Sequence, residues 1–288
     1  MNRTSHTDDD QAMRWSGQAG RAWVEAQQVL DQMFQPLEDM LMEAIRTSSG
    51  VRVLDVGCGT GSTTLAAARS AGTQGRCVGI DISDPMIVAA RKRAEKSGSS
   101  ARFICADAQI FAFEPASFDL IISRFGVMFF DDPVRAFAIL RHAARTGAGL
   151  RLVAWRGAAE NPFMTTAEHA AAPLLPNIPA RVHNAPGQFA FADPQRVCGI
   201  LKESGWTDIE IRPIDVSCAL PERDLDGYLI RLGPVGRALE EVDEQTWSRV
   251  VDKVRAAFEP YVSGVEVRFD AACWIIEAQV PSSSATAQ

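Results

Sequence analysis

Short apolar segments alternate with segments of helical spacing through the first half of the chain. The runs at 51–56, 76–82 and 101–105 are short and mostly apolar, as the buried strands of parallel sheets are. Helix signals lie between them: 62–71 is rich in Ala and Leu, and Asp84-Pro85 offers an N-cap carboxylate followed by proline. Strand, turn and helix in this order predict βαβ units.

The alternation continues as far as Trp155. Strands are predicted at 118–123 and 150–155, on either side of a helix that begins at Asp132-Pro133. Five strands alternating with helices predict an α/β fold, in which helices cover both faces of a mostly parallel sheet.

The pattern changes after Trp155. Residues 157–192 contain five prolines and only three charged residues, which is too apolar for a linker and too proline-rich for one long helix. The elements expected after this segment are a helix from Asp193-Pro194, a strand over 207–216 interrupted by Pro213, helical spacing over 247–258 and a last strand over 265–280.

Composition narrows the class of protein. The chain has 288 residues, 47% of them hydrophobic and 23% charged, which indicates a soluble globular protein and excludes collagen, coiled coil and disorder. Its net charge of -7 comes without a basic run, so nucleic acid is not expected as a partner. No apolar run has the length of a membrane span, and Asp8, Asp9 and Asp10 stand where a secretory signal would be apolar. We therefore expect a cytoplasmic protein.

The six cysteines form no C-x-x-C pair and no Cys/His spacing suited to zinc. Most of them lie in apolar segments, so we expect packing roles and no metal site.

The most informative segment is VLDVGCGTG at 53–61, between a predicted strand and a predicted helix. Gly57, Gly59 and Gly61 allow a sharp turn and a close approach of backbone N–H groups to a ligand. A G-x-G-x-x-G dinucleotide fingerprint would place its third glycine at Ser62 instead. Asp55, two residues before the first glycine, would repel a pyrophosphate, which disfavours a nicotinamide cofactor.

Three carboxylates fall at the ends of successive predicted strands. Asp55 suits an ammonium group, Asp81 suits the vicinal hydroxyls of a ribose, and Asp107 suits the exocyclic amine of adenine, with Ile82 packed on the ring. Any one of them alone would be better explained as a turn or cap residue. Together they describe a ligand with an amino acid end, a ribose and an adenine, which is S-adenosylmethionine.

At these residues the chain resembles a known family. Four segments, D-V-G-C-G-T-G at 55–61, G-I-D-I-S at 79–83, A-D-A at 106–108 and S-R-F-G-V-M-F-F-D-D-P at 123–133, look like the successive motifs of class I SAM-dependent methyltransferases. The resemblance points to the branch related to ubiquinone/menaquinone C-methyltransferases and bacterial natural-product methyltransferases. It implies a Rossmann-like, seven-stranded sheet whose last strand is antiparallel, with S-adenosylhomocysteine as the product.

The resemblance also implies positions for the cofactor. Asp55 and the glycine loop would hold its methionine end, Asp81 its ribose, and Asp107 its adenine. The full set of cofactor-binding residues it predicts is Asp55, Gly57, Cys58, Gly59, Gly61, Thr64, Asp81, Ile82, Asp107, Ala108, Arg124 and Trp23.

The rest of the chain is predicted to hold the methyl acceptor. Residues 1–48 would form a helical cap, 49–280 the SAM-binding domain with lid insertions at 157–192 and 221–260, and 281–288 a disordered tail. The low charge and aromatic content of the first insertion favour a largely apolar small molecule, aromatic or quinone-like, with O, N or C as the methylated atom. His169 and His183 in that insertion are the candidate general bases, although scaffolding is the commoner role for such a histidine. A homodimer is left open.

Two other functions stay open at this point. A SAM-binding regulatory protein without catalysis would keep the same binding motifs. A nicotinamide-dependent oxidoreductase is disfavoured, because neither Tyr228 nor Tyr261 is followed four residues later by lysine.

Overall fold

The computed structural model describes residues 11–13, 15–46, 50–176, 178–182 and 184–282. Much of the predicted tail and the first ten residues of the predicted cap therefore lie outside the described residues. The described strands are β1 (Arg52–Val56), β2 (Arg76–Asp81), β3 (Arg102–Cys105), β4 (Phe118–Arg124), β5 (Ala144–Trp155), β6 (Thr207–Pro221), β7 (Val262–Ser263) and β8 (Glu266–Gln279).

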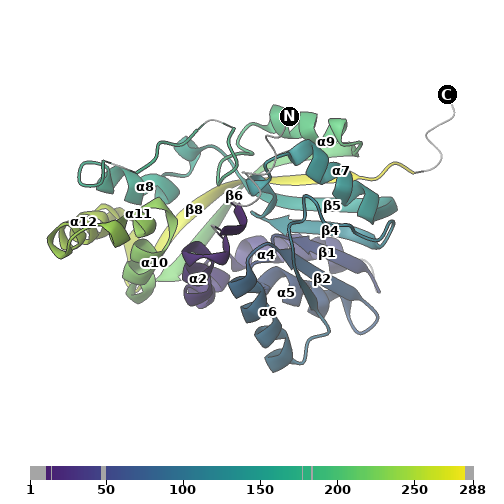
Figure 1. The fold of residues 1–288 in the computed structure, drawn as a ribbon, viewed down its shortest axis with the longest axis horizontal. Helices are drawn as coiled ribbons and strands as arrows, with labels where there is room; N and C mark the ends of the chain where they lie inside the picture. The colour runs from purple at the N-terminus through teal and green to yellow at the C-terminus, as the bar shows by residue number, and fades with distance from the viewer. Residues whose placement is uncertain (1–10, 14, 47–49, 177, 183, 283–288) are drawn as a thin grey trace.

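One mixed sheet contains all of these strands, in the order β3-β2-β1-β4-β5-β8-β6, with the two-residue β7 paired to β8 (Figure 1). The first five strands along this path pair in parallel. Strand β8 lies antiparallel between β5 and β6. The Rossmann-like order and the antiparallel last strand predicted from the sequence are confirmed.

Helices cover both faces of the sheet. On one face lie α4, α5 and α6, which follow the N-terminal α2 and α3, and on the other lie α7 and α9 (Figure 1). Where β6 and β8 extend beyond β5, α8 packs on α12, and α10 contacts α11 and α12. Their bounds are α2 (Gln18–Glu25), α3 (Gln27–Met33), α4 (Gln35–Arg46), α5 (Ser62–Ala71), α6 (Asp84–Ser97), α7 (Pro133–Ala143), α8 (Pro162–Ala171), α9 (Pro194–Glu203), α10 (Leu225–Arg231), α11 (Gly233–Ala238) and α12 (Glu244–Ala257).

The local sequence explains where helices such as α7 begin. Asp132 caps α7 by accepting a hydrogen bond from the Arg135 N–H at 3.0 Å, and the proline that follows it has no N–H to lose. The core is continuous from α4 through the sheet, with Leu54, Ile121 and Ile276 fully buried.

Two local predictions were wrong. Ser83, not Asp84, is the N-cap residue of α6, and Asp84 lies inside the first turn. Strand β6 runs through Pro213 without interruption. Among the described strands it pairs with β8 alone, so its other edge needs no N–H from the proline.

None of the helices that the structure describes combines the length and apolar character that a membrane span needs.

Candidate functional site

The glycine loop joins β1 to α5 in a backbone conformation that requires glycine. Gly57, Gly59 and Gly61 have φ angles of +68°, +54° and +87°. A Cβ on Gly57 would lie 2.5 Å from the Cα of Gly126, so the loop and the end of β4 touch through bare backbone. A Cβ on Gly61 would lie 2.9 Å from the ring of Phe103. The loop is therefore fixed on both sides, and its remaining side faces a cavity.

This glycine-loop cavity opens at the carboxyl ends of the parallel strands, where open α/β sheets bind ligands. Its volume is about 130 Å³. The predicted cofactor residues that line it are Gly57, Gly59, Asp81, Ile82, Asp107, Ala108, Arg124 and Trp23.

Asp81 and Asp107 present carboxylates to this cavity. Asp81 accepts hydrogen bonds from the N–H groups of Gly59 at 2.8 Å and Ser83 at 2.9 Å, and burial raises its pKa. Asp107 accepts from the backbone and side chain of Gln109 at 2.8 and 3.3 Å. A carboxylate has about four acceptor positions, so both side chains keep capacity for a ligand.

Asp55 lies behind the loop, 1% exposed, and does not line the cavity. Its Oδ2 accepts hydrogen bonds from Thr63 at 2.5 Å and Thr64 at 2.6 Å, while its Oδ1 has no partner among the described residues. Burial raises the pKa of Asp55 to about 6, against the lowering effect of the two threonine hydroxyls and Arg124. Gly61, Cys58 and Thr64 also lie outside the cavity lining, and the roles predicted for these four residues stay predictions.

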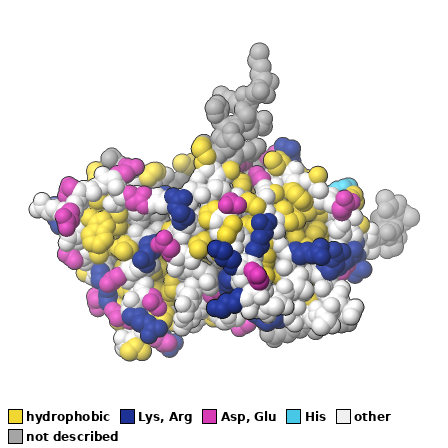
Figure 2. All heavy atoms as spheres, turned by 60° about the horizontal axis from the view of Figure 1, so that its bottom comes forward, with side chains coloured by type: hydrophobic (Ala, Val, Ile, Leu, Met, Phe, Trp, Pro, Cys, Tyr) yellow, Lys and Arg dark blue, Asp and Glu magenta, His cyan; other side chains and the backbone are white. Residues whose placement is uncertain are grey.

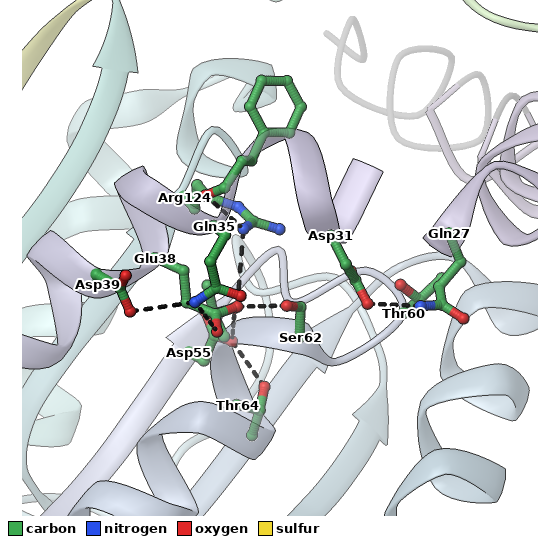
Figure 3. Close-up of polar contacts among 12 residues, drawn as sticks. Gln27, Asp31, Gln35, Glu38, Asp39, Asp55, Thr60, Ser62, Thr64 and Arg124 are labelled. Carbon is green, nitrogen blue, oxygen red and sulfur yellow. Dashed lines mark hydrogen bonds and ion pairs between the residues drawn. The ribbon is translucent and has the colours of Figure 1, made fainter. Parts of the chain in front are cut away.

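Glu38 connects the N-terminal helices to the loop, and sequence reasoning missed it (Figure 3). It is 2% exposed, accepts a short hydrogen bond from Ser62 at the start of α5, and lies 3.8 Å from the guanidinium of Arg124. The sequence did carry a signal, because Glu38 stands three and seven residues before the buried Leu41 and Ile45, in the apolar stripe of α4.

A second, larger cavity adjoins the first. We call it the lid cavity; its volume is about 790 Å³, and it lies among α2, α3, α8, α10, α11 and residues 179–182, 184–190 and 192. Phe163, Met164 and Phe189 of the first predicted lid insertion line it, as do Tyr228 and Phe258 of the second. Phe191 of the first insertion instead packs in the core near Phe137.

Four aromatic residues line both cavities: Trp15, Trp23, Phe125 and Phe129. The indole of Trp15 meets the rings of Trp23 and Phe129 edge-on, at 6.1 and 5.2 Å between centroids. Phe125 has a φ of +67°, rare for a bulky residue, and its ring stacks on Trp155 at 4.5 Å. Such strained backbone is typical of functional sites. We call these four residues the aromatic junction.

The backbone of the N-terminal segment is attached next to this junction. The Ser83 hydroxyl donates to the carbonyl oxygen of Trp15 at 2.6 Å. A Cβ on the buried Gly20 would lie 1.9 Å from the same carbonyl, so α2 packs against it only because residue 20 is glycine.

The structure does not place His169, one of the two predicted bases, in the lining of either cavity. His169 is exposed on α8, whose residues Met164, Ala167 and Glu168 face the lid cavity instead. This orientation gives His169 no contact with a molecule in that cavity. His183 lies outside the described residues. In the part of the chain that the structure describes, no three His, Cys, Asp or Glu side chains converge as metal ligands would.

Comparison with known sequences adds independent evidence. A family model described as "Methyltransferase domain" matches residues 53–147. Aklanonic acid methyltransferase of a Streptomyces species is 38% identical over 119 residues, which are 40% of this chain and 54% of that protein. Demethylmenaquinone methyltransferase of Renibacterium salmoninarum is 26% identical over 184 residues, 61% of this chain and 75% of that protein. The chain thus spans about half the length of the first relative.

Solved structures share the fold. Haemonchus contortus phosphoethanolamine N-methyltransferase 2, in complex with phosphomonomethylethanolamine and S-adenosylhomocysteine, has a TM-score of 0.58 at 17% identity, over 98% of this chain and 61% of that chain. The [4+2]-cyclase SpnF has a TM-score of 0.51 at 20% identity, over 85% and 82%. The chain therefore contains a region that matches a methyltransferase domain, at residues 53–147, and it is similar to methyltransferases in sequence and in fold.

Proposed function

We propose that this chain binds S-adenosylmethionine in the glycine-loop cavity and transfers its methyl group to an acceptor in the lid cavity. The observation that carries the proposal is the aromatic junction, because it is the lining that the two cavities share. Two ligands, one in each cavity, would meet at these four rings.

The residues present suit this cofactor. A Cβ on Gly59 would meet only the sulfur of Met86, at 3.6 Å, so the loop leaves space for a ligand beside it. Asp81 and Asp107 offer acceptor oxygens for hydroxyl and amine donors. The Oδ1 of Asp55 has no hydrogen-bond partner among the described residues, which supports the predicted site for a cationic end, reached directly or through water.

The contribution of the protein is expected to be positioning and exclusion of water. The cofactor supplies a methyl group that is electrophilic because it is bonded to a sulfonium. The side chains of Trp15, Trp23 and Phe129 would keep water from the transfer point, and the lid cavity would hold the acceptor in line, an effect that lowers the barrier by several kcal/mol. Since His169 faces away from the cavity, we propose no histidine base among the described residues.

The acceptor is proposed to be a largely apolar small molecule, aromatic or quinone-like. Aromatic and aliphatic side chains dominate the lid cavity. The names of two relatives, an aklanonic acid and a demethylmenaquinone methyltransferase, suit such a substrate. Basic side chains on the face in Figure 2 are interspersed with acidic and apolar ones, which supports a small molecule over nucleic acid. We also propose that residues 1–48 act as a cap over the domain at 49–280, with lids at 157–192 and 221–260.

The test combines binding with turnover. Titration calorimetry with S-adenosylmethionine, S-adenosylhomocysteine and NADH should show binding of the first two and none of the third. Methyl-labelled cofactor should then label members of a library of phenols, aromatic acids and quinones. Tight cofactor binding without labelling would favour a SAM-binding protein that transfers no methyl group, since binding motifs can persist without that activity. The cyclase SpnF, which has a similar fold, is named for a reaction other than methyl transfer. Binding of NADH alone would overturn the proposal.

A further inference from the structure

The lid cavity contains four charged side chains, and three of them have partners. Arg181 forms an ion pair with Glu168 at 2.5 Å and lies over the ring of Phe189 at 4.6 Å. Arg231 lies 3.3 Å from Glu25. The side chain of Arg237, on α11, forms neither an ion pair nor a hydrogen bond with any residue that the structure describes.

Arg237 is half-buried and lines the cavity, so water that fills the cavity contacts its side chain. An apolar molecule that fills the cavity displaces that water. A guanidinium that loses water without gaining an acceptor costs several kcal/mol, which would oppose binding of a wholly apolar ligand.

Tyr228 adds a second donor in the same cavity. Its hydroxyl makes one hydrogen bond, to the sulfur of Met164 at 3.8 Å, and a thioether is a weak acceptor. Tyr228 and Arg237 therefore both offer donors for which the described residues supply no oxygen acceptor. Glu168, the one carboxylate among the described residues that line the cavity, is already paired with Arg181.

We propose that the molecule bound in the lid cavity carries an acidic oxygen, a carboxylate or a phenolate, on an apolar ring system. Arg237 pairs with that oxygen, and the Tyr228 hydroxyl donates a further hydrogen bond within the cavity. The inference rests on the proposed function, since it takes this cavity as the acceptor site. It names the polar group of the acceptor, whichever atom is methylated.

The test uses matched pairs of probes with the full chain saturated by S-adenosylhomocysteine. Anthraquinone-2-carboxylate is compared with anthraquinone-2-carboxamide, and 2-hydroxyanthraquinone above its pKa with 2-methoxyanthraquinone, by titration calorimetry. We expect at least one acidic probe to bind about 10-fold more tightly than its neutral partner, the usual effect of a charge-assisted hydrogen bond. The pair that shows the difference tells a carboxylate from a phenolate.

Variants assign the effect to its residues. Arg237→Gln should abolish the preference and leave the affinity for the neutral probe within about twofold, while Tyr228→Phe should reduce it about threefold. Arg249→Gln, which removes the same charge from an exposed position on α12 outside the cavity, should keep the full preference. Circular dichroism and affinity for S-adenosylhomocysteine check that each variant is folded.

The proposal is overturned if no acidic probe is preferred, if neither pair binds, or if Arg237→Gln keeps the preference. Any of these results together with normal S-adenosylhomocysteine binding leaves the proposed function standing. Loss of S-adenosylhomocysteine binding in the unmodified protein would instead refute the proposed function.

Discussion

The buried Asp55 makes a quantitative prediction about pH. Its pKa is about 6 in the folded chain, against 3.8 for an ordinary aspartate, because burial opposes its charge. The folded state therefore holds a proton that the unfolded state releases, so stability falls as the pH rises from about 4 to 6. A shift of about two units corresponds to roughly 3 kcal/mol in total, of which roughly 2 kcal/mol is lost between pH 4 and pH 6.

The Asp55→Asn variant removes this dependence. Asparagine keeps an oxygen that can accept from Thr63 and Thr64 and cannot ionise. Urea unfolding of both proteins at pH 4, 5, 6 and 7 gives the free energies of unfolding. The free energy of unfolding of the variant minus that of the unmodified chain should increase by about 2 kcal/mol between pH 4 and 6 and then level off. A difference that stays flat, or that decreases with pH, would refute the raised pKa.

The same group should respond to cofactor. If the ammonium end of S-adenosylhomocysteine lies near Asp55, binding at pH 5 releases a proton, because a nearby cation favours the ionised carboxyl. Calorimetry in two buffers of different ionisation enthalpy measures the proton release on binding, and the Asp55→Asn variant should not show this release. Equal heats in both buffers would place the ammonium elsewhere.

Three further substitutions test the site. Glu38→Gln removes the carboxylate next to Arg124, whose side chain is 13% exposed, and should cost about 2 to 4 kcal/mol in urea unfolding; a loss below 0.5 kcal/mol would mean the pair contributes little. Gly57→Ala places a Cβ 2.5 Å from Gly126 at a φ of +68°, so thermal unfolding should show a loss of about 2 to 5 kcal/mol, and an unchanged Tm would contradict the close approach. Asp81→Ala should weaken S-adenosylmethionine binding by about 1 to 3 kcal/mol in calorimetry, and unchanged affinity would exclude its predicted role.

Local signals were enough to predict the parallel strands and the glycine loop. The positive φ angles of the turn at 57–61 favour glycine for a local reason, and α5 follows it with the bounds predicted. Proline signals misled where they depended on tertiary context: Pro213 would break a central strand, but β6 is an edge strand.

The site was predicted less completely, because some of the residues that line it are far apart in the sequence and come together only in the folded chain. Phe125 and Phe129 belong to the quoted motif at 123–133, but nothing in their spacing says that they meet tryptophans of the N-terminal segment. The sequence placed His169 in a predicted lid insertion but did not show on which face of a helix it would lie. Once α8 is recognised as a helix, Met164, Ala167 and Glu168 mark its cavity face by spacings of three and four, and His169 falls outside it.

The unequal lengths of β5, β6 and β8 affect where the chain can tolerate insertions and deletions. Pairing of β8 with β5 ends at Cys273, whereas pairing with β6 continues to Glu266, opposite Pro221. Helices α10, α11 and α12 are thus inserted beyond the parallel sheet, at the end of a ribbon that β6 and β8 form and that β7 joins at its tip (Figure 1). We expect residues between 222 and 265 to tolerate insertion, deletion or exchange without a shift in the register of β1, which leads into the glycine loop, because β1 pairs with β2 and β4.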